Sequence, residues 1–322
     1  MNQNKNALYL KLHSSPRSNS LPKTLGISSL DIPINENIYG SFSKKVKKEL
    51  IKFYRDIQNE RTLIIEYDGN FIPILYLFWV NIIYKKRFKI FLDCHVNSYM
   101  NIKSLSFKTL TKRLIIYIFK SFLNARIVVH NKKSLKLFKG SIYCPSPFPR
   151  IDFDRNVKRN LCDVFIISSL NKDEPVNEFV KVAKKLNSMG LKTLISGDIE
   201  KLENNESLDK SLFSGFLNKN EFYEYILDSR VVVAMTIRKN NLLYAPREAI
   251  QMNKICLIND SEENIDFYGD ICFYSSPNSE LILKKIEKII KKDCLPRKDK
   301  IEELIQNVDQ KVNDFKKCLN TY

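Results

Sequence analysis

The sequence predicts an α/β protein with two doubly wound domains, each built on a parallel sheet. Short runs that are apolar throughout alternate with amphipathic segments, and this alternation occurs twice along the 322 residues. Strands that are apolar on both faces are typical of parallel sheets covered by helices on both sides. The proline-rich stretch PSPFPRID (145–152) separates the two blocks. We therefore expect an N-terminal domain over 1–152, a C-terminal domain over 153–299, and a helix over 300–322 that can pack back on the first domain.

The first block contains short β-rich runs between longer segments of helical character. The run TLIIEY, for example, ends at Asp68-Gly69, which is a turn signal. Strands are expected at 7–12, 62–67, 88–92 and 125–129, and helices at 73–84 and 104–123.

The second block repeats this alternation more regularly. Gly190 follows the first of its amphipathic segments and is a natural helix C-cap. Strands are expected at 163–167, 192–195, 230–235, 255–258 and 270–274, and helices at 174–189, 220–227, 246–252 and 279–291. Ligands of such sheets bind beyond the carboxyl ends of the strands, so the residues that follow strands become candidate site residues.

All three histidines of the chain follow expected strands of the first block: His13, His95 and His130. A histidine there can hydrogen-bond a sugar hydroxyl, carry a proton or contact a phosphate. For any one of them, satisfying the backbone of a loop is an equally good explanation. Their common place at one sheet edge favours a functional role for the group.

Small, hydroxyl-bearing and basic residues follow the strands of the second block. Ser169, Gly197 and Thr236 allow a ligand to approach the backbone, while Lys172 and Arg238 supply positive charge for phosphates. Neither a dinucleotide-binding glycine fingerprint nor a P-loop is present in the sequence.

Glu248 opens a helix within the stretch YAPREAIQMNKICLIND, with Pro246 at its first position. A carboxylate in a first helical turn can simply complement the helix dipole, by about 0.3–1 kcal/mol. The same carboxylate, at the carboxyl edge of a sheet, can accept both hydroxyls of a ribose diol while nearby N–H groups meet a diphosphate.

Four segments of the second half, taken in order, carry a family resemblance. They are FIISSLNKDEPVNEFVKVAKKL, LFSGFLNKNEFYEYILDSRVVVAMT, YAPREAIQMNKICLIND and FYGDICFYSSPNSELILKKIEKI. Together they resemble the C-terminal domain of GT-B glycosyltransferases, specifically the family 4-like group that uses sugar nucleotides. KIFLDCHVNSY and ARIVVHNKKSLKLF resemble the N-terminal domain of that family more loosely. The resemblance implies a GT-B fold, with two Rossmann-like domains facing a central cleft.

The resemblance also implies roles for individual residues. Glu248 corresponds to the glutamate that contacts the donor ribose, Lys172 and Arg238 to groups that neutralise the diphosphate, and His95 to a group near the transferred sugar. These last three form the expected catalytic set. The expected donor-binding set is Ser169, Gly197, Phe216, Thr236, Tyr244 and Glu248, and the expected acceptor-side set is His13, Arg17, Asn97 and His130.

The sequence departs from the pattern of the family at several positions. Asn240 stands where the earlier of two paired glutamates is usual, and Asn253 stands for the glycine of the corner after the helix. No D-x-D follows a suitable strand to hold a metal, so we expect metal-independent transfer from a nucleoside diphosphate sugar, with no further cofactor. The resemblance implies that anomeric configuration is retained.

The chain carries 53 Lys and Arg against 36 Asp and Glu, a net charge of +17, which indicates an anionic partner or solubility alone. Its seven cysteines form no C-x-x-C, which favours reduced thiols and a cytoplasmic protein. The longest uncharged run, 69–84, is shorter than the roughly 20 residues that a membrane-spanning helix needs, so we expect no spanning segment. The segment 103–123 has a row of lysines beside apolar residues; it is either a peripheral contact with an anionic membrane or a core helix with a solvated stripe.

The expected partners are a nucleotide sugar and a glycan or lipid-linked acceptor, in the assembly of a bacterial or archaeal surface polysaccharide, glycolipid or glycoprotein glycan. Two alternatives stay open. One is a non-catalytic GT-B-like partner subunit, which the departure at Asn240 favours. The other is a basic nucleic-acid-binding protein, although the lysines are scattered and no recognised module is present.

Overall fold

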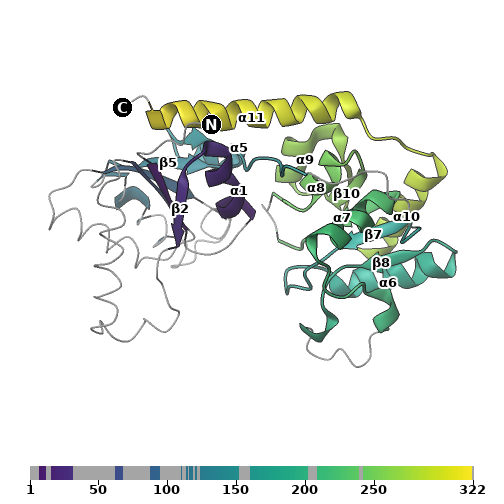
Figure 1. Ribbon diagram of the computed structural model, residues 1–322. Helices are drawn as coiled ribbons and strands as arrows, with labels where there is room; N and C mark the ends of the chain where they lie inside the picture. Colours follow the sequence, from purple (N-terminus) through teal and green to yellow (C-terminus); the bar gives the residue numbers. More distant parts are fainter. Residues whose placement is uncertain are drawn as a thin grey trace. The chain divides into compact units, whose positions relative to one another are not determined.

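The computed structural model describes residues 7–11, 16–31, 62–67, 88–94, 110, 114, 116–118, 120–121, 124–151, 160–201, 209–238 and 242–320. The chain forms two compact units (Figure 1). Unit 1 comprises Met1–Pro147 with Asn307–Tyr322, and unit 2 comprises Phe148–Gln306. Each unit has its own sheet and its own hydrophobic core.

Unit 1 is built on a six-stranded sheet with the order β2-β1-β3-β4-β5-β6, in which every neighbouring pair is parallel. The strands are β1 (Ala7–Lys11), β2 (Ser28–Asp31), β3 (Thr62–Tyr67), β4 (Lys89–Cys94), β5 (Arg126–Val129) and β6 (Ile142–Tyr143). In the described part of the first 147 positions, the helices with defined bounds are α1 (Pro16–Leu25) and α5 (Lys132–Leu137). The chain order reverses between β1 and β3, which marks a topological switch point.

The four strands expected in the first block are confirmed, while α1, β2, α5 and β6 are additions. The expected helix at 73–84 lies outside the described residues. The described residues of the stretch 104–123 are helical, and four of their apolar side chains are exposed: Leu110, Leu114, Tyr117 and Ile118.

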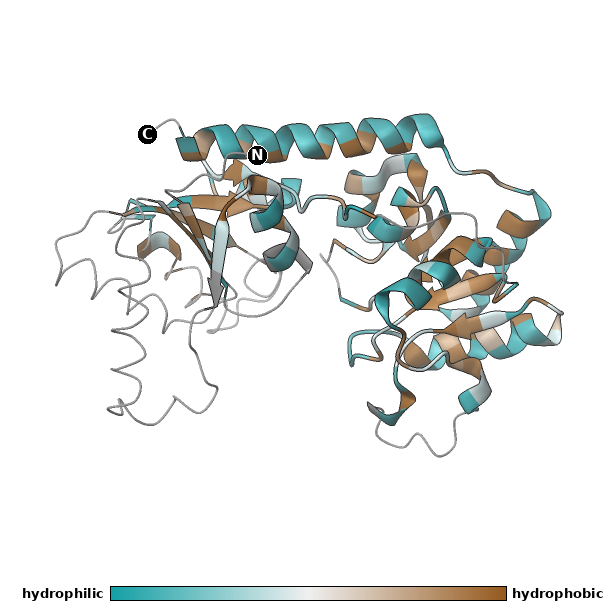
Figure 2. Ribbon diagram, in the orientation of Figure 1, coloured by the Kyte–Doolittle hydropathy of each residue, from teal (hydrophilic) through white to brown (hydrophobic). Residues whose placement is uncertain are grey.

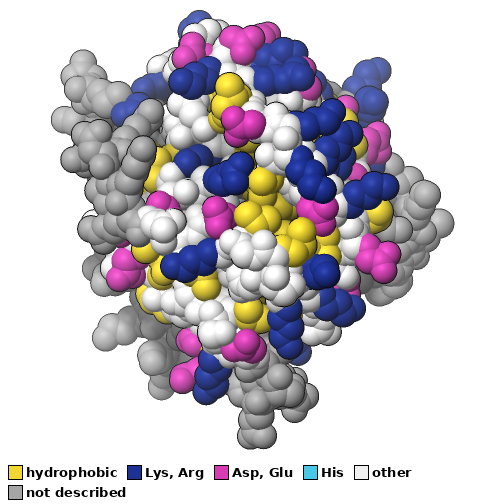
Figure 3. All heavy atoms as spheres, turned by 90° about the vertical axis from the view of Figure 1, so that its right-hand side faces the viewer, with side chains coloured by type: hydrophobic (Ala, Val, Ile, Leu, Met, Phe, Trp, Pro, Cys, Tyr) yellow, Lys and Arg dark blue, Asp and Glu magenta, His cyan; other side chains and the backbone are white. Residues whose placement is uncertain are grey.

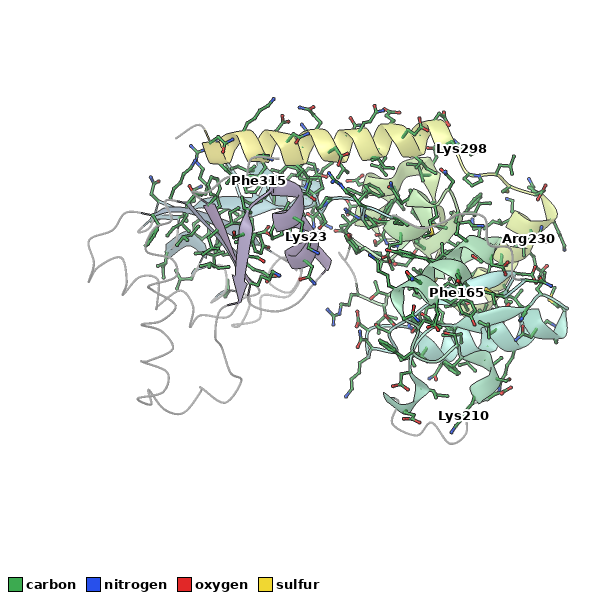
Figure 4. All side chains as sticks on the ribbon, in the orientation of Figure 1. Lys23, Phe165, Lys210, Arg230, Lys298 and Phe315 are labelled. Atoms are coloured by element: carbon green, nitrogen blue, oxygen red, sulfur yellow. The ribbon has the colours of Figure 1, made fainter. Side chains whose placement is uncertain are left out.

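The core of unit 1 is completed by helix α11 (Lys298–Asn320), the last element of the chain. Val312, Phe315 and Leu319 belong to the same buried cluster as Tyr9, Ile64 and other strand residues. The ring of Phe315 meets that of Phe91 edge-on, with centroids 5.4 Å apart. Figure 4 shows Phe315 on the side of α11 that faces the strands.

Unit 2 is built on a five-stranded parallel sheet with the order β11-β10-β9-β7-β8. The strands are β7 (Val164–Ile167), β8 (Thr193–Ile195), β9 (Val231–Ala234), β10 (Ile255–Asn259) and β11 (Phe273–Ser275). Numbered within the unit this is the order 5-4-3-1-2, that of flavodoxin-like sheets, and the switch point lies between β7 and β9.

Helices connect these strands as the parallel topology requires. They are α6 (Val176–Ser188), α7 (Lys219–Asp228), α8 (Pro246–Gln251), α9 (Glu262–Tyr268) and α10 (Ser279–Lys291). Buried residues of α6 and α10 share one cluster with the apolar strands, and the strands are hydrophobic while the outer faces of the helices are hydrophilic (Figure 2). All strands and helices expected in this block are confirmed, and α9 is an addition. The last strand is shorter than expected because Gly269–Ile271 forms a 3₁₀ turn.

No helix in the described part of the chain is long and apolar enough to cross a membrane. On the face drawn in Figure 3, Lys and Arg side chains are interspersed with Asp and Glu, around a patch of hydrophobic side chains. The positive charge on this face therefore does not form one continuous basic surface.

Candidate functional site

A pocket of about 360 Å³ opens at the switch point of unit 2. The ends of both central strands line it, through Ile167 and Ser168 at the end of β7 and Ala234 and Met235 at the end of β9. The rest of its lining comes from Ser169, Glu174, Ser196, Gly197, Asp198, Gly215, Phe216, Leu217, Phe222, Leu243 and Ala245. This is the position at which an open α/β sheet binds its ligand.

Two glycines bring bare backbone to the wall of the pocket. The backbone N–H of Gly197 donates to the carbonyl of Gly215 at 3.3 Å. Gly197 has a φ of +116°, and a Cβ there would lie 2.8 Å from Cγ of Leu170. Both its conformation and the space around it therefore exclude a side chain at this position.

The loop after β7 is held by its own side chains. The backbone N–H of Ser168 donates to Oγ of Ser196 at 2.8 Å, and that hydroxyl donates back to the carbonyl of Ser168 at 2.9 Å. The Glu174 carboxylate accepts hydrogen bonds from the hydroxyls of Ser168 and Ser169 and from the N–H of Ser169. A carboxylate therefore lies in the lining of the pocket.

Glu248 lies in the first turn of α8, three residues beyond the lining residue Ala245. Burial raises the pKa of its carboxyl group, and this is opposed by a hydrogen bond from Tyr223 and by the charge of Lys219. The Tyr223 hydroxyl donates to Oε1 of Glu248 over 3.5 Å, and desolvation together with the nearby carboxylate raises the pKa of Tyr223 to about 12. Lys219 Nζ stands 5.5 Å from the centroid of the Tyr223 ring. Glu248 is thus a partly desolvated acceptor with one phenol and one cation beside it.

A buried arginine anchors the start of the same helix. Arg247 is 1% exposed, and its guanidinium lies 4.6 Å from the ring centroid of Phe267, 5.2 Å from that of Tyr244 and 5.3 Å from that of Phe148. Such cation–π contacts hold a desolvated guanidinium in place. They fix the backbone from which Glu248 projects.

The loop after β9 is tied to the loop after β7 through Asp173. Thr236 donates its hydroxyl to the carbonyl of Asp173 at 2.9 Å, and Arg238 Nε lies 3.1 Å from Oδ2 of Asp173. The Arg238 side chain is 64% exposed. Lys172 is also exposed and is not among the residues that line the pocket.

Three of the six expected donor-binding residues line the pocket. Ser169, Gly197 and Phe216 line the pocket, and Phe216 is 79% exposed at its edge. Thr236 and Tyr244 each adjoin a lining residue in the chain, Met235 and Ala245 respectively. Asn240 lies outside the described residues.

On the side of unit 1, His130 is the one expected site residue whose side chain the structure describes. It follows β5, and its Nε2 lies 2.5 Å from the carbonyl oxygen of Cys94 at the end of β4. His13, His95 and Asn97 lie outside the described residues, and for Arg17 only the backbone is described, within α1. Within the described ranges, no group of three or more His, Cys, Asp and Glu side chains is arranged to hold a metal ion.

Sequence reasoning missed several residues around the pocket: Glu174, Tyr223, Lys219, Asp173 and Arg247. The sequence shows Glu174 as a charged residue just before an expected helix, but no pattern in it indicates that this side chain lies in the lining of the pocket. The buried Arg247 carried no sequence signal at all, because arginine is rarely buried.

Neither a protein-family model nor a curated protein sequence matches the chain. Solved structures do match it. A glycosyltransferase from Rickettsia africae ESF-5 is 14% identical with a TM-score of 0.64, over 97% of this chain and 94% of that one. Anabaena Alr3699/HepE in complex with UDP and glucose is 12% identical with a TM-score of 0.65, over 99% of this chain and 100% of that one.

Sucrose-phosphate synthase from Thermosynechococcus elongatus is likewise 12% identical with a TM-score of 0.57, over 96% of this chain and 94% of that one. Identities this low establish the fold alone. The chain has the GT-B fold of these structures, so the expected fold class, α/β with two Rossmann-like parallel-sheet domains, is confirmed.

Proposed function

We propose that the protein is a glycosyltransferase that moves a sugar from a nucleoside diphosphate sugar to an acceptor hydroxyl. The observation that carries the proposal is the pocket at the β7–β9 switch point, with the bare backbone of Gly197 and Gly215 in its wall. Helix α8, which bears Glu248 in its first turn, begins directly after the lining residue Ala245. A flat base fits against bare backbone, and a ribose diol needs a carboxylate acceptor. The GT-B structures that resemble the chain include one in complex with UDP and glucose, which supports this assignment of the ligand.

In this proposal Glu248 accepts the ribose hydroxyls, and Ser169, Gly197, Phe216, Thr236 and Tyr244 surround the donor. Lys172 and Arg238 stabilise the diphosphate as it leaves, which requires no metal ion. His95 lies near the transferred sugar, and His13, Arg17, Asn97 and His130 lie on the acceptor side. The donor side belongs to 153–299 and the acceptor side to 1–152.

We propose membership of the family 4-like group with degenerate motifs, transfer of a hexosyl or related group with retention, and a role in surface polysaccharide, glycolipid or glycoprotein glycan assembly. The protein acts in the cytoplasm, with peripheral contact between 103–123 and an anionic membrane. The four exposed apolar side chains in the described part of that segment support such a contact.

A non-catalytic partner subunit of the same fold is the second candidate, and the departure at Asn240 favours it. It predicts that no nucleotide sugar is turned over or bound. The interspersed charges of Figure 3 give no support to a nucleic-acid-binding surface on that face.

Binding of UDP-, GDP-, ADP- and dTDP-sugars, measured by thermal shift and calorimetry, tests the proposal. We expect one donor class to bind and Glu248→Ala to weaken that binding by roughly tenfold or more, because a partly desolvated acceptor of two hydroxyls is lost. Glu280→Ala is the matched control, since Glu280 is also in the first turn of a helix, but its helix α10 does not begin at a residue that lines the pocket. Absence of binding by every donor rejects the enzyme, and equal binding by wild type and Glu248→Ala rejects this site.

A further inference from the structure

Three hydrogen-bond donors of the loop after β7 converge on one carboxylate inside the pocket. Glu174 Oε2 accepts from the Ser168 hydroxyl at 2.5 Å and from the Ser169 backbone N–H at 2.9 Å. Glu174 Oε1 accepts from the Ser169 hydroxyl at 2.8 Å. A backbone N–H with two hydroxyls is a donor set that also binds the oxygens of a phosphate. The chain therefore fills a ready-made anion position with an anion of its own.

The three donors are held in place by the rest of the fold as well as by Glu174. The N–H of Leu170, which has a φ of +58°, donates to the Ser168 hydroxyl oxygen at 3.0 Å. The Asn171 side chain donates to the Ser169 hydroxyl oxygen at 2.6 Å. The N–H of Ser168 is bound to Ser196. The donor set consequently persists when the carboxylate rotates out.

The charge of the pocket lining is acidic. Its ionisable side chains within the described part of the chain are Glu174 and Asp198, and no lysine or arginine is among the lining residues. Arg238 pairs with Asp173, and Lys172 is exposed outside the lining. A diphosphate that enters therefore meets a carboxylate at the position where its own oxygens would be bound.

We infer that Glu174 is an internal competitor for the donor phosphate: its carboxylate occupies the phosphate-binding position and must leave before a nucleoside diphosphate can bind. The inference rests on the proposed function and deepens it. The nucleoside part of the ligand does not need the loop donors, so Glu174 lowers the affinity for the nucleotide and leaves that for the free nucleoside unchanged. Glu174 thus sets how strongly the pocket distinguishes a nucleotide from its nucleoside.

The test compares each nucleoside with its diphosphate. Affinities of uridine and UDP, adenosine and ADP, guanosine and GDP, and thymidine and dTDP are measured by calorimetry on wild type and Glu174→Gln. For the base that binds, we expect the diphosphate to bind Glu174→Gln about tenfold more tightly than wild type, because one like charge is removed from contact with it. The affinity for the nucleoside stays the same.

A second variant and a control make the result specific. Glu174→Ala removes the carboxylate together with its hydrogen bonds, and it should also favour the diphosphate over the nucleoside. Glu280→Gln removes the same charge from an exposed helix start outside the pocket and should change neither affinity. Circular dichroism shows whether each variant is folded.

The outcomes separate the inference from the proposed function. If the nucleotide binds wild type and both Glu174 variants equally, the inference is wrong and the proposed function stands. If both variants gain equally for nucleoside and diphosphate, the carboxylate does not compete with the phosphate in particular and the inference is again wrong. If no nucleoside or nucleotide binds any of the proteins, the proposed function fails and the inference fails with it.

Discussion

Glu248 illustrates how far a single residue can be interpreted from sequence. Its place in the first turn of a helix after an apolar strand was predictable, because both elements have clear patterns. Its partner Tyr223 was not predictable, since that residue lies 25 positions away in α7 and meets Glu248 only through tertiary packing. The desolvation of the carboxyl group follows from the same packing.

This desolvation predicts a stability effect that depends on pH. The pKa of Glu248 is raised above its ordinary value of 4.5, so the folded protein favours the protonated form. The contribution of the protonated Glu248 to the free energy of unfolding is fully present at a pH below the pKa of this group in the unfolded chain. It is lost as the pH rises through the higher pKa of the group in the folded protein. At pH 7 the ionised carboxylate therefore costs stability. Glu248→Gln should raise the free energy of unfolding at pH 7, with a gain on the order of 1 kcal/mol.

Urea unfolding from pH 4 up to pH 8 measures this difference, which should shrink as the pH falls toward 4.5, the ordinary pKa of the carboxyl group. The exposed Glu280→Gln serves as the reference. A Glu248→Gln protein that is less stable than wild type at pH 7, or a difference that does not change with pH, would contradict the raised pKa.

Glu174 shows what sequence reasoning misses at the level of the residue. The basic Lys172 was the natural candidate for a phosphate ligand, since it follows a strand and carries the required charge. In the structure Leu170 takes a positive φ and the N–H of Glu174 bonds to the carbonyl of Asn171, so the loop turns back and aims the glutamate at the two serines. Side-chain direction in a short loop depends on such bonds, which leave no periodic signal.

At the scale of elements, length decided what could be predicted. The buried strands of both sheets and the long amphipathic helices α6 and α10 have enough residues to show a period. Among the missed elements, α1 has ten residues with Pro22 inside it, whereas β2, α5, β6 and α9 have four, six, two and seven residues. Segments this short are stabilised by neighbours rather than by their own pattern.

The corner at the C-terminus of α8 forms although the sequence has Asn253 in place of a glycine. Asn253 has a φ of +57°. Its backbone N–H donates to the carbonyl of Ile250 at 2.9 Å, and the backbone N–H of Lys254 donates to the carbonyl of Ala249 at 2.9 Å. These two bonds form a Schellman motif, in which the left-handed residue is usually glycine. Asparagine tolerates this conformation better than most residues.

The motif predicts opposite effects of two substitutions at Asn253. Asn253→Ala should destabilise the protein by about 1 kcal/mol, because alanine resists the left-handed conformation. Asn253→Gly should be as stable as wild type or slightly more stable. Denaturant unfolding of both variants provides the measurement.

Asn220→Ala is the matched control, because Asn220 is an exposed residue in the right-handed turns of α7, where alanine is favoured. If Asn253→Ala and Asn253→Gly have the same stability, the conformation of residue 253 does not limit the stability of this corner.

At the scale of the whole molecule, the chain builds two separate cores. The cluster in unit 2 contains residues between 164 and 294, while the cluster in unit 1 combines residues of the first 144 positions with Val312, Phe315 and Leu319 of α11. The alternation of strands and helices predicted two sheets. The repeated switch-point order could not be predicted, because strand order depends on packing between segments distant in sequence.

The composition of the first core leads to a prediction about domain-specific stability. Phe315 is fully buried against Phe91, and Lys89 Nζ donates to the carbonyl of Cys318 at 2.7 Å on the same helix. Phe315→Ala should therefore destabilise unit 1 by about 3–5 kcal/mol, the usual cost of removing a buried phenylalanine. Since unit 2 has its own core, its strands should be unaffected. Lys311→Ala, an exposed change on α11, is the control.

Hydrogen exchange measured by mass spectrometry distinguishes the two units within one protein. Phe315→Ala should accelerate exchange in β1, β3 and β4, whose residues share the cluster with Phe315, and leave β7 and β9 protected as in wild type. Two separate cores allow one unit to open while the other stays closed, since the buried cluster that contains Phe315 is made of unit 1 residues. Equal acceleration in both sheets would mean that the protein unfolds as a single cooperative unit, with the long helix α11 coupling the stability of the two cores.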